Sequence, residues 1–160
     1  MESISTYFTS ILLYKTPNAV AQIMGNRNYQ ELNGVARFYE TAFPGILMEL
    51  TLFGLPTKNE EHTFEFFGLH IHEIGNCQLP FNQTGEHYSK EMRKHPMHSG
   101  DLPPVIAQEG YSFMSVYLPQ LTIEEVMNRS IIVHRNPDDF TTQPSGDSGE
   151  KIGCGVIRAV

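Results

Sequence analysis

Three observations predict a single all-β domain, folded as an antiparallel sandwich or barrel. Short apolar segments recur along the chain, and strands at such intervals are typical of antiparallel sandwiches and barrels. Turn-forming pairs such as Asn33-Gly34 and Pro44-Gly45 separate the segments, because glycine, proline and asparagine favour turn geometry. A chain of 160 residues is also long enough for one domain that buries about 68 to 70% of its unfolded surface.

Residues 1–18 precede the predicted domain, which spans residues 19–160. They carry a short apolar stretch at 7–14, and Pro17 follows it. A helix, an added edge strand and a partner contact are all compatible with this stretch, so its structure stays open.

The domain contains seven predicted strands separated by turns. Thr122 and Glu125 have the spacing of a capping box, which predicts one helical turn over 122–128. Two irregular segments, 75–110 and 135–150, are too long for passive connections and are expected to be functional loops. The predicted strands are 19–24, 34–39, 46–53, 63–74, 111–118, 130–134 and 152–158.

Five of the seven histidines fall between residues 68 and 101. The first two, His70 and His72, lie in a predicted strand, where side chains alternate between the two faces. They therefore share one face while Leu69 and Ile71 share the other. This arrangement predicts a pair of imidazole ligands for a metal ion, backed by the apolar core.

The next candidate ligands lie in a segment punctuated by Gly and Pro, without apolar periodicity. Three imidazoles and a carboxylate make a complete tetrahedral zinc set, and a site with four protein ligands is of the structural kind. The residues are His87, His95, His98 and Asp101.

A further histidine, His134, ends the apolar run 131–133 far downstream. Because imidazole suits copper as well as zinc, it could complete a copper site with His70, His72 and His87. His62 lies outside all of these motifs and is assigned no role.

The formal charge of −7 predicts no nucleic-acid partner, because binding to the phosphate backbone needs clustered Lys and Arg. No apolar stretch approaches the roughly 18 residues of a membrane span, so no membrane partner is expected. Residues 1–14 lack the cationic start and the small-residue cleavage pattern of a signal peptide. We therefore expect the protein either in the cytoplasm or exported after removal of a leader.

Four segments resemble, in order, the copper-ligand, zinc-loop, electrostatic-loop and carboxyl-terminal signatures of copper/zinc superoxide dismutases. The resemblance covers roughly residues 18–160. Two residues between His95 and His98, and Cys77 placed five residues after His72, are similar to the bacterial branch of the family. The segments are GLHIHEIG, GEHYSKEMRKHPMHSGDLPPV, RSIIVHRNPDDF and GEKIGCGVIRAV.

The resemblance implies a Greek-key antiparallel β-sandwich or barrel of immunoglobulin-like type, with about eight strands and two long functional loops. It also implies one copper and one zinc per subunit, with His87 as the ligand that they share. The implied copper ligands are His70, His72, His87 and His134, and the implied zinc ligands are His87, His95, His98 and Asp101.

The implied activity is disproportionation of superoxide, in which two superoxide anions and two protons yield dioxygen and hydrogen peroxide. Copper must be the redox ion because zinc has no redox chemistry. In the implied mechanism, the first superoxide reduces copper(II), His87 leaves copper and takes up a proton, and the second superoxide reoxidises copper(I) while collecting protons. The same ligands would also serve a non-enzymatic copper-storage protein or a zinc-only structural sandwich. Monomer and homodimer both stay open.

The two cysteines, Cys77 and Cys154, are joined by the resemblance as an intrasubunit disulfide. Closing a loop of 77 residues would stabilise the fold by roughly 4 to 5 kcal/mol in the chain-entropy model. Two free buried thiols are the alternative, which a cytoplasmic location would favour.

Two charged residues carry further implied roles. Asp138 lies four residues after His134, where the family has a carboxylate between copper and zinc histidines; an ordinary turn aspartate is the alternative. Lys151 lies three residues before Cys154, where the family usually has an arginine that guides the anion to copper. Lysine keeps the charge but loses the rigid two-pronged donor. A solvated surface lysine is the alternative.

Overall fold

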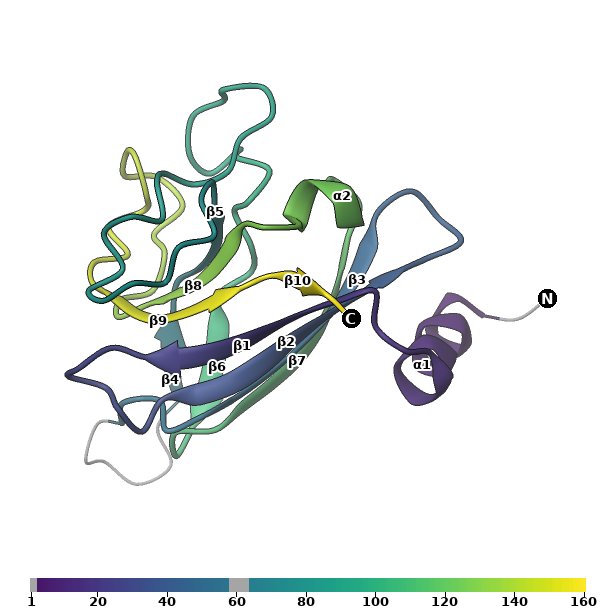
Figure 1. Ribbon diagram of the computed structural model, residues 1–160, viewed down its shortest axis with the longest axis horizontal. Helices are drawn as coiled ribbons and strands as arrows, with labels where there is room; N and C mark the ends of the chain where they lie inside the picture. Colours follow the sequence, from purple (N-terminus) through teal and green to yellow (C-terminus); the bar gives the residue numbers. More distant parts are fainter. Residues whose placement is uncertain (1–2, 58–63) are drawn as a thin grey trace.

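The computed structural model describes residues 3–57 and 64–160 and is predominantly β (Figure 1). It confirms the predicted antiparallel β-sandwich or barrel, with ten strands in place of about eight. The helices are α1 (Ile4–Tyr14) and α2 (Ile123–Val126). The strands are β1 (Ala19–Gly25), β2 (Asn33–Glu40), β3 (Ile46–Phe53), β4 (Phe64–Phe67), β5 (Leu69–His72), β6 (Val105–Gln108), β7 (Ser112–Leu118), β8 (Ser130–His134), β9 (Lys151–Val156) and β10 (Arg158–Ala159).

The larger sheet has the strand order β5-β8-β9-β1-β2-β3-β7, and β10 pairs with β1. A smaller sheet consists of β4 and β6. Neighbouring strands pair antiparallel throughout the described part of the chain. The two long loops, after β5 and after β8, lie together at one end of the molecule, whereas α1 lies at the other (Figure 1).

The strand predicted over 63–74 is corrected by the structure, although residue 63 lies outside the described residues. Two strands replace it, since β4 pairs with β6 and β5 pairs with β8. The switch occurs at Gly68, which donates its N–H to the carbonyl of Asn136 and accepts the N–H of His134. A Cβ at Gly68 would lie 2.8 Å from the Ser148 hydroxyl oxygen, so the close approach of the second long loop requires glycine here.

Strand β6 was missed, because residues 75–110 were predicted to be one irregular loop. Its four residues alternate between buried and exposed, which is the period of a half-buried strand. The segment is too short for this alternation to stand out in the sequence, and its pairing with β4 decides its conformation.

The core lies between the inward faces of the strands, as alternation predicts. In β1, Ala19, Ala21 and Ile23 are fully buried while Gln22 and Met24 are exposed. The core side chains exclude water from one side of β5, which therefore presents its histidines from a fixed support.

The predicted disulfide between Cys77 and Cys154 is present, with 5.7 Å between the two Cα atoms. It joins the loop after β5 to strand β9. Phe81 and Ile132 are buried around it. The alternative of two free thiols is therefore wrong, and the bond ties the first long loop to the sheet.

Of the three alternatives for residues 7–14, the structure has a helix. The Ser3 hydroxyl accepts the N–H of Thr6 and caps α1. Ile11 packs with Tyr39 and Leu47, which are directly opposite each other on β2 and β3. The division of the chain into an extension of residues 1–18 and a domain of residues 19–160 stays a prediction.

The predicted capping box of Thr122 and Glu125 is also present at the start of α2. Among the described residues, no helix combines the length and the hydropathy needed to cross a lipid bilayer.

We expect Ile11→Ala to lower the free energy of unfolding by about 2 kcal/mol, because it deletes buried apolar atoms from the contact between α1 and the sheet. Ile4→Ala is the matched control, since Ile4 is 63% exposed and Ile11 only 3%; we expect it to change stability by less than about 0.5 kcal/mol. Urea unfolding measures both. If Ile11→Ala also changed the free energy of unfolding by less than about 0.5 kcal/mol, the contact between α1 and the sheet would not stabilise the fold.

Candidate metal centre

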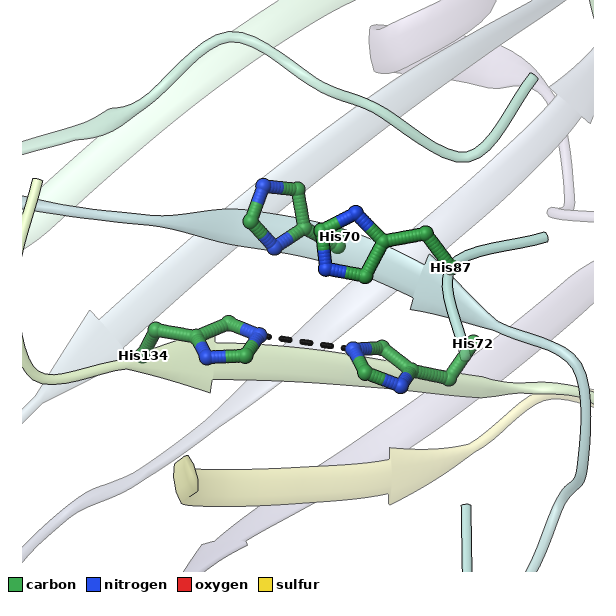
Figure 2. Close-up of side chains that lie close together, drawn as sticks. All are labelled: His70, His72, His87 and His134. Atoms are coloured by element: carbon green, nitrogen blue, oxygen red, sulfur yellow. Dashed lines mark hydrogen bonds between the residues drawn. The ribbon is translucent and has the colours of Figure 1, made fainter. Parts of the chain in front are cut away.

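The first group of ligands forms where the loop after β5 folds back on that strand. His70 and His72 project from β5, and His134 ends the neighbouring strand β8. His87 lies in the loop and pairs with His72 in an isolated β-bridge. One ligand atom from each of these four residues lies within 4.8 Å of the others. We call this set the four-histidine group, and Figure 2 shows its rings side by side.

The outward nitrogens of three of these rings have hydrogen-bond acceptors. His72 Nδ1 lies 2.9 Å from the Gly85 carbonyl, His134 Nδ1 lies 3.2 Å from the Gly149 carbonyl, and His70 Nε2 lies 2.8 Å from Asp138. A carbonyl or carboxylate only accepts, so each outward nitrogen carries the proton and donates it. The opposite nitrogen of each ring is then an acceptor with a free lone pair.

The inward nitrogens consequently face each other without protons. His72 Nε2 and His134 Nε2 are 3.3 Å apart, as the dashed line in Figure 2 marks. His70 Nδ1 and His87 Nε2 are buried and have no hydrogen-bond partner. Converging, unsatisfied lone pairs in a dry interior cost free energy unless a cation or proton lies between them. The donor set therefore fits a metal ion with imidazole preference.

The second group contains His87, His95, His98 and Asp101, whose ligand atoms also lie within 4.8 Å of one another. We call it the mixed group. Asp101 Oδ1 is 2.8 Å from His87 Nδ1, and Asp101 Oδ2 is 3.2 Å from His95 Nδ1 and from His98 Nδ1. Asp101 is itself held by an isolated bridge to His70 and by the backbone N–H of His98.

His95 shows most clearly that the mixed group fits a cation. Its Nε2 lies 2.9 Å from Asp138 Oδ1, so Nε2 donates and Nδ1 has a lone pair. Nδ1 makes no hydrogen bond although Asp101 Oδ2 is only 3.2 Å away. A lone pair facing a carboxylate is repulsive, whereas a zinc ion between nitrogen and oxygen donors satisfies both.

Asp138 connects the two groups through ring nitrogens that point away from the proposed metal positions. Its two carboxylate oxygens accept from His70 Nε2 and His95 Nε2, and its side chain is fully buried. Oδ1 also accepts the backbone N–H of Phe140. An acceptor behind a ligand fixes the tautomer and the orientation of the ring. Asp138 thus makes contacts that a solvated turn aspartate does not.

Burial disfavours protonation throughout the four-histidine group. It is the largest cause that lowers the pKa of His70 and of His72 to about 2 and that of His134 to about 4, and neighbouring imidazoles add to it. Burial alone would raise the pKa of Asp101, but hydrogen bonds from His87 and from the His98 backbone lower it to about 2. Neutral imidazole and ionised carboxylate are the forms that bind metals.

Lys151 lies beside the four-histidine group. It is the first residue of β9 and is directly opposite His134 across the strand pair. Its ammonium donates to the Thr84 hydroxyl oxygen at 2.8 Å. Burial lowers the pKa of Lys151, and Glu86 opposes this shift. Lys151 is half-buried rather than solvated.

All residues predicted as metal ligands come together in two adjacent groups that share His87, and His62 lies outside the described residues. The contributions of Thr84, Gly85 and Gly149 were not predicted from the sequence. Gly85 and Gly149 act through backbone carbonyls, which any residue type has. Their positive φ angles, 72° and 70°, explain why glycine suits both positions.

Residues 32–157 match the family described as copper/zinc superoxide dismutase (SODC). The chain belongs to this family. It is 31% identical over 144 residues to superoxide dismutase [Cu-Zn] 2 of Aquifex aeolicus, a match that covers 80% of each chain. A double mutant of a SOD-like protein from Bacillus subtilis has 25% identity and a TM-score of 0.75, over 85% of this chain and 94% of the other.

The family likeness also extends to a protein with another described role. The copper chaperone for superoxide dismutase of Homo sapiens is 29% identical over 139 residues, which cover 79% of this chain and 48% of the chaperone. Membership of the copper/zinc superoxide dismutase family therefore leaves two functions to distinguish, enzyme and copper-binding protein.

The metal-free protein should lose stability as the pH falls from 7 to 5. The folded-state pKa values of His70, His72 and His134 lie below the ordinary 6.5. The unfolded chain therefore takes up protons that the folded chain refuses, and stability is fully present only above about pH 6.5. Each histidine contributes on the order of 1 kcal/mol per pH unit. Asp101 acts in the same direction, but only below about pH 4.

Urea unfolding at pH 7, 6 and 5 measures this loss, which we expect to exceed about 2 kcal/mol in total. The variant His134→Gln removes one titrating ring and should flatten the dependence. An unfolding midpoint that stays constant from pH 7 to 5 would contradict the proposed neutral state of the group.

Proposed function

We propose that the protein is a superoxide dismutase with a copper ion in the four-histidine group and a zinc ion in the mixed group. The observation that carries this proposal is the shared residue. His87 offers Nε2 to one group and Nδ1 to the other. Once Nδ1 gives up its proton, the ring is an imidazolate and would be able to bind an ion of different chemistry on each side. Lys151 and Asp138 support it as the anion-attracting and ring-orienting residues.

The reaction requires electron and proton transfer. Copper supplies one-electron redox chemistry when bound, which zinc cannot supply. His87 has the protein's part in proton transfer: when Nε2 is free of metal it is an acceptor, and it can hold a proton for the peroxide being formed. Nδ1 of His87 and the Asp101 carboxylate would both be zinc ligands meanwhile, so the ring would keep its place within the mixed group. His70 and His95 stay oriented through Asp138.

Lys151 attracts the substrate. The chain has a formal charge of −7, so its overall field repels an anion, and only a local positive charge can concentrate superoxide at the site. The ammonium of Lys151 supplies this charge next to His72 and His134, whose pKa values it helps to lower. We therefore assign Lys151 to substrate guidance.

A copper-binding protein without enzymatic activity is the second candidate, and the likeness to the copper chaperone supports it. The same donor groups would then store or pass on copper. A zinc-only protein, which would use the mixed group alone, is a variant of this candidate.

The decisive experiment is to load the purified metal-free protein with copper(II) and zinc, measure both metals, and follow superoxide removal. We expect about one copper and one zinc per chain and removal far faster than copper-free controls. The variant His87→Gln should lose copper–zinc bridging and most of the activity. Binding of both metals without activity above buffer would favour the second candidate, and zinc without copper the zinc-only form.

Substitution of Lys151 should change turnover in a salt-dependent way. At low ionic strength we expect Lys151→Ala to lower kcat/KM by about tenfold, because local positive charge steers the anion. The loss should shrink as salt rises, since the Debye length falls from about 30 Å at 0.01 M to about 8 Å at 0.15 M. Lys151→Arg should raise kcat/KM, because guanidinium is a more rigid donor. Indifference of kcat/KM to both substitutions would reject this role.

A further inference from the structure

The position of the Lys151 ammonium depends on more than its own backbone. Lys151 pairs with His134 next to a shift in the register between β8 and β9. Its charge lies close enough to lower the pKa values of His72 and His134, so the ammonium lies beside the four-histidine group. Lysine, however, is a point charge on a flexible stem with several rotatable bonds. A fixed position of the Lys151 ammonium therefore requires a contact with another residue.

Thr84 is the residue that makes this contact. It is fully buried, and its hydroxyl donates to the Phe81 carbonyl at 3.1 Å. A hydroxyl has one proton to donate and two lone pairs. Because the proton is committed to Phe81, the lone pairs face the Lys151 ammonium, which donates to Thr84 Oγ1 at 2.8 Å. Thr84 is thus set as an acceptor.

The backbone around Thr84 is fixed to the His72 side chain, at the end of β5, and to the chain just after that strand. The Thr84 carbonyl accepts the N–H of Ile74, and the next carbonyl, that of Gly85, accepts from His72 Nδ1 at 2.9 Å. Two successive residues therefore hold the ammonium and one ring of the four-histidine group. Their spacing is set by the chain itself, so any movement of one contact moves the other.

We propose that Thr84 is a positioning residue that holds the Lys151 ammonium beside His72 and His134 and thereby sets how strongly a small anion binds at that side of the group. The inference rests on the proposed copper site and deepens it. Thr84 contributes a rigid acceptor where the lysine lacks a rigid donor. The Thr84 hydroxyl bonds to the Phe81 carbonyl and to the Lys151 ammonium, so Thr84 acts on the four-histidine group through Lys151.

Azide titration of the copper- and zinc-loaded protein tests this role without using turnover. Azide is a small anion that ligates copper(II), and its binding changes the visible absorption of the ion. We expect Thr84→Val to weaken azide binding by about threefold to tenfold, because the valine has the same shape but no acceptor. Thr84→Ser keeps the hydroxyl and should stay within about twofold of the wild type.

The double variant with Lys151→Met separates positioning from packing. If Thr84 acts through the ammonium, Thr84→Val should have no further effect on azide binding once the ammonium is removed. An undiminished loss in the Lys151→Met background would overturn the proposal, and so would wild-type azide affinity in Thr84→Val alone. A third outcome separates this inference from the proposed function. If Thr84→Val has no further effect on azide binding in the Lys151→Met background, but the loaded wild-type protein removes no superoxide, the inference stands and the proposed function is rejected.

A second readout uses the metal-free protein. We expect N-hydroxysuccinimide acetate to acetylate Lys151 several times faster in Thr84→Val than in wild type or Thr84→Ser, as measured by peptide mass spectrometry, because the released ammonium enters solvent. Lys90, which pairs with Glu125, is an internal control in the same samples. Equal rates at Lys151 in all three proteins would contradict the contact.

Discussion

The structure depends on one constraint, which is that the lone pairs of six imidazole rings and one carboxylate converge in a largely buried site. The outward nitrogens of His70, His72 and His134 are each committed to an acceptor, so their inward nitrogens have no proton to share. This arrangement is unfavourable by itself, because buried acceptors without donors cost free energy. Metal ions remove that cost, and metal binding is then linked to folding.

The rest of the fold supports this convergence from several directions. The core holds β5 from one side, and the two long loops close over it from the other (Figure 1). Asp138 connects the four-histidine group to the mixed group through a single buried carboxylate. The bond between Cys77 and Cys154 ties the first long loop to β9, the strand that begins with Lys151. The first loop is thus tied to the sheet by the disulfide, and the second is tied to the histidines by Asp138.

The electrostatics of the site follow from its position at the loop end of an acidic protein. Burial lowers the pKa values of His70, His72 and His134 and so favours their neutral forms, while the Lys151 ammonium supplies positive charge beside His72 and His134. We propose that its contact with Thr84 holds this charge in place, because lysine by itself is a flexible donor. Anion binding at this side of the group would then depend on both residues.

The sequence alone predicted much of this protein because the relevant signals are local. Alternation in β5 separates His70 and His72 from Leu69 and Ile71 whatever the rest of the fold, and Thr122 with Glu125 form their capping box within one turn. The ligand residues could be named from their types and order, with help from the resemblance to the family. The disulfide, too, followed from that resemblance.

Only the tertiary structure decided the features that depend on distant partners. Residues 64–72 make two strands because β6 pairs with the first part and β8 with the second. Ser148 lies close to Gly68, between the two strands, where a Cβ would not fit without a shift. The stretch 7–14 belongs to helix α1, which packs on the sheet through the contact of Ile11 with Tyr39 and Leu47. The Gly85 and Gly149 carbonyls and the Thr84 hydroxyl hold functional side chains from far along the sequence. Backbone acceptors carry no residue-type signal, so their roles exist only once the chain has folded.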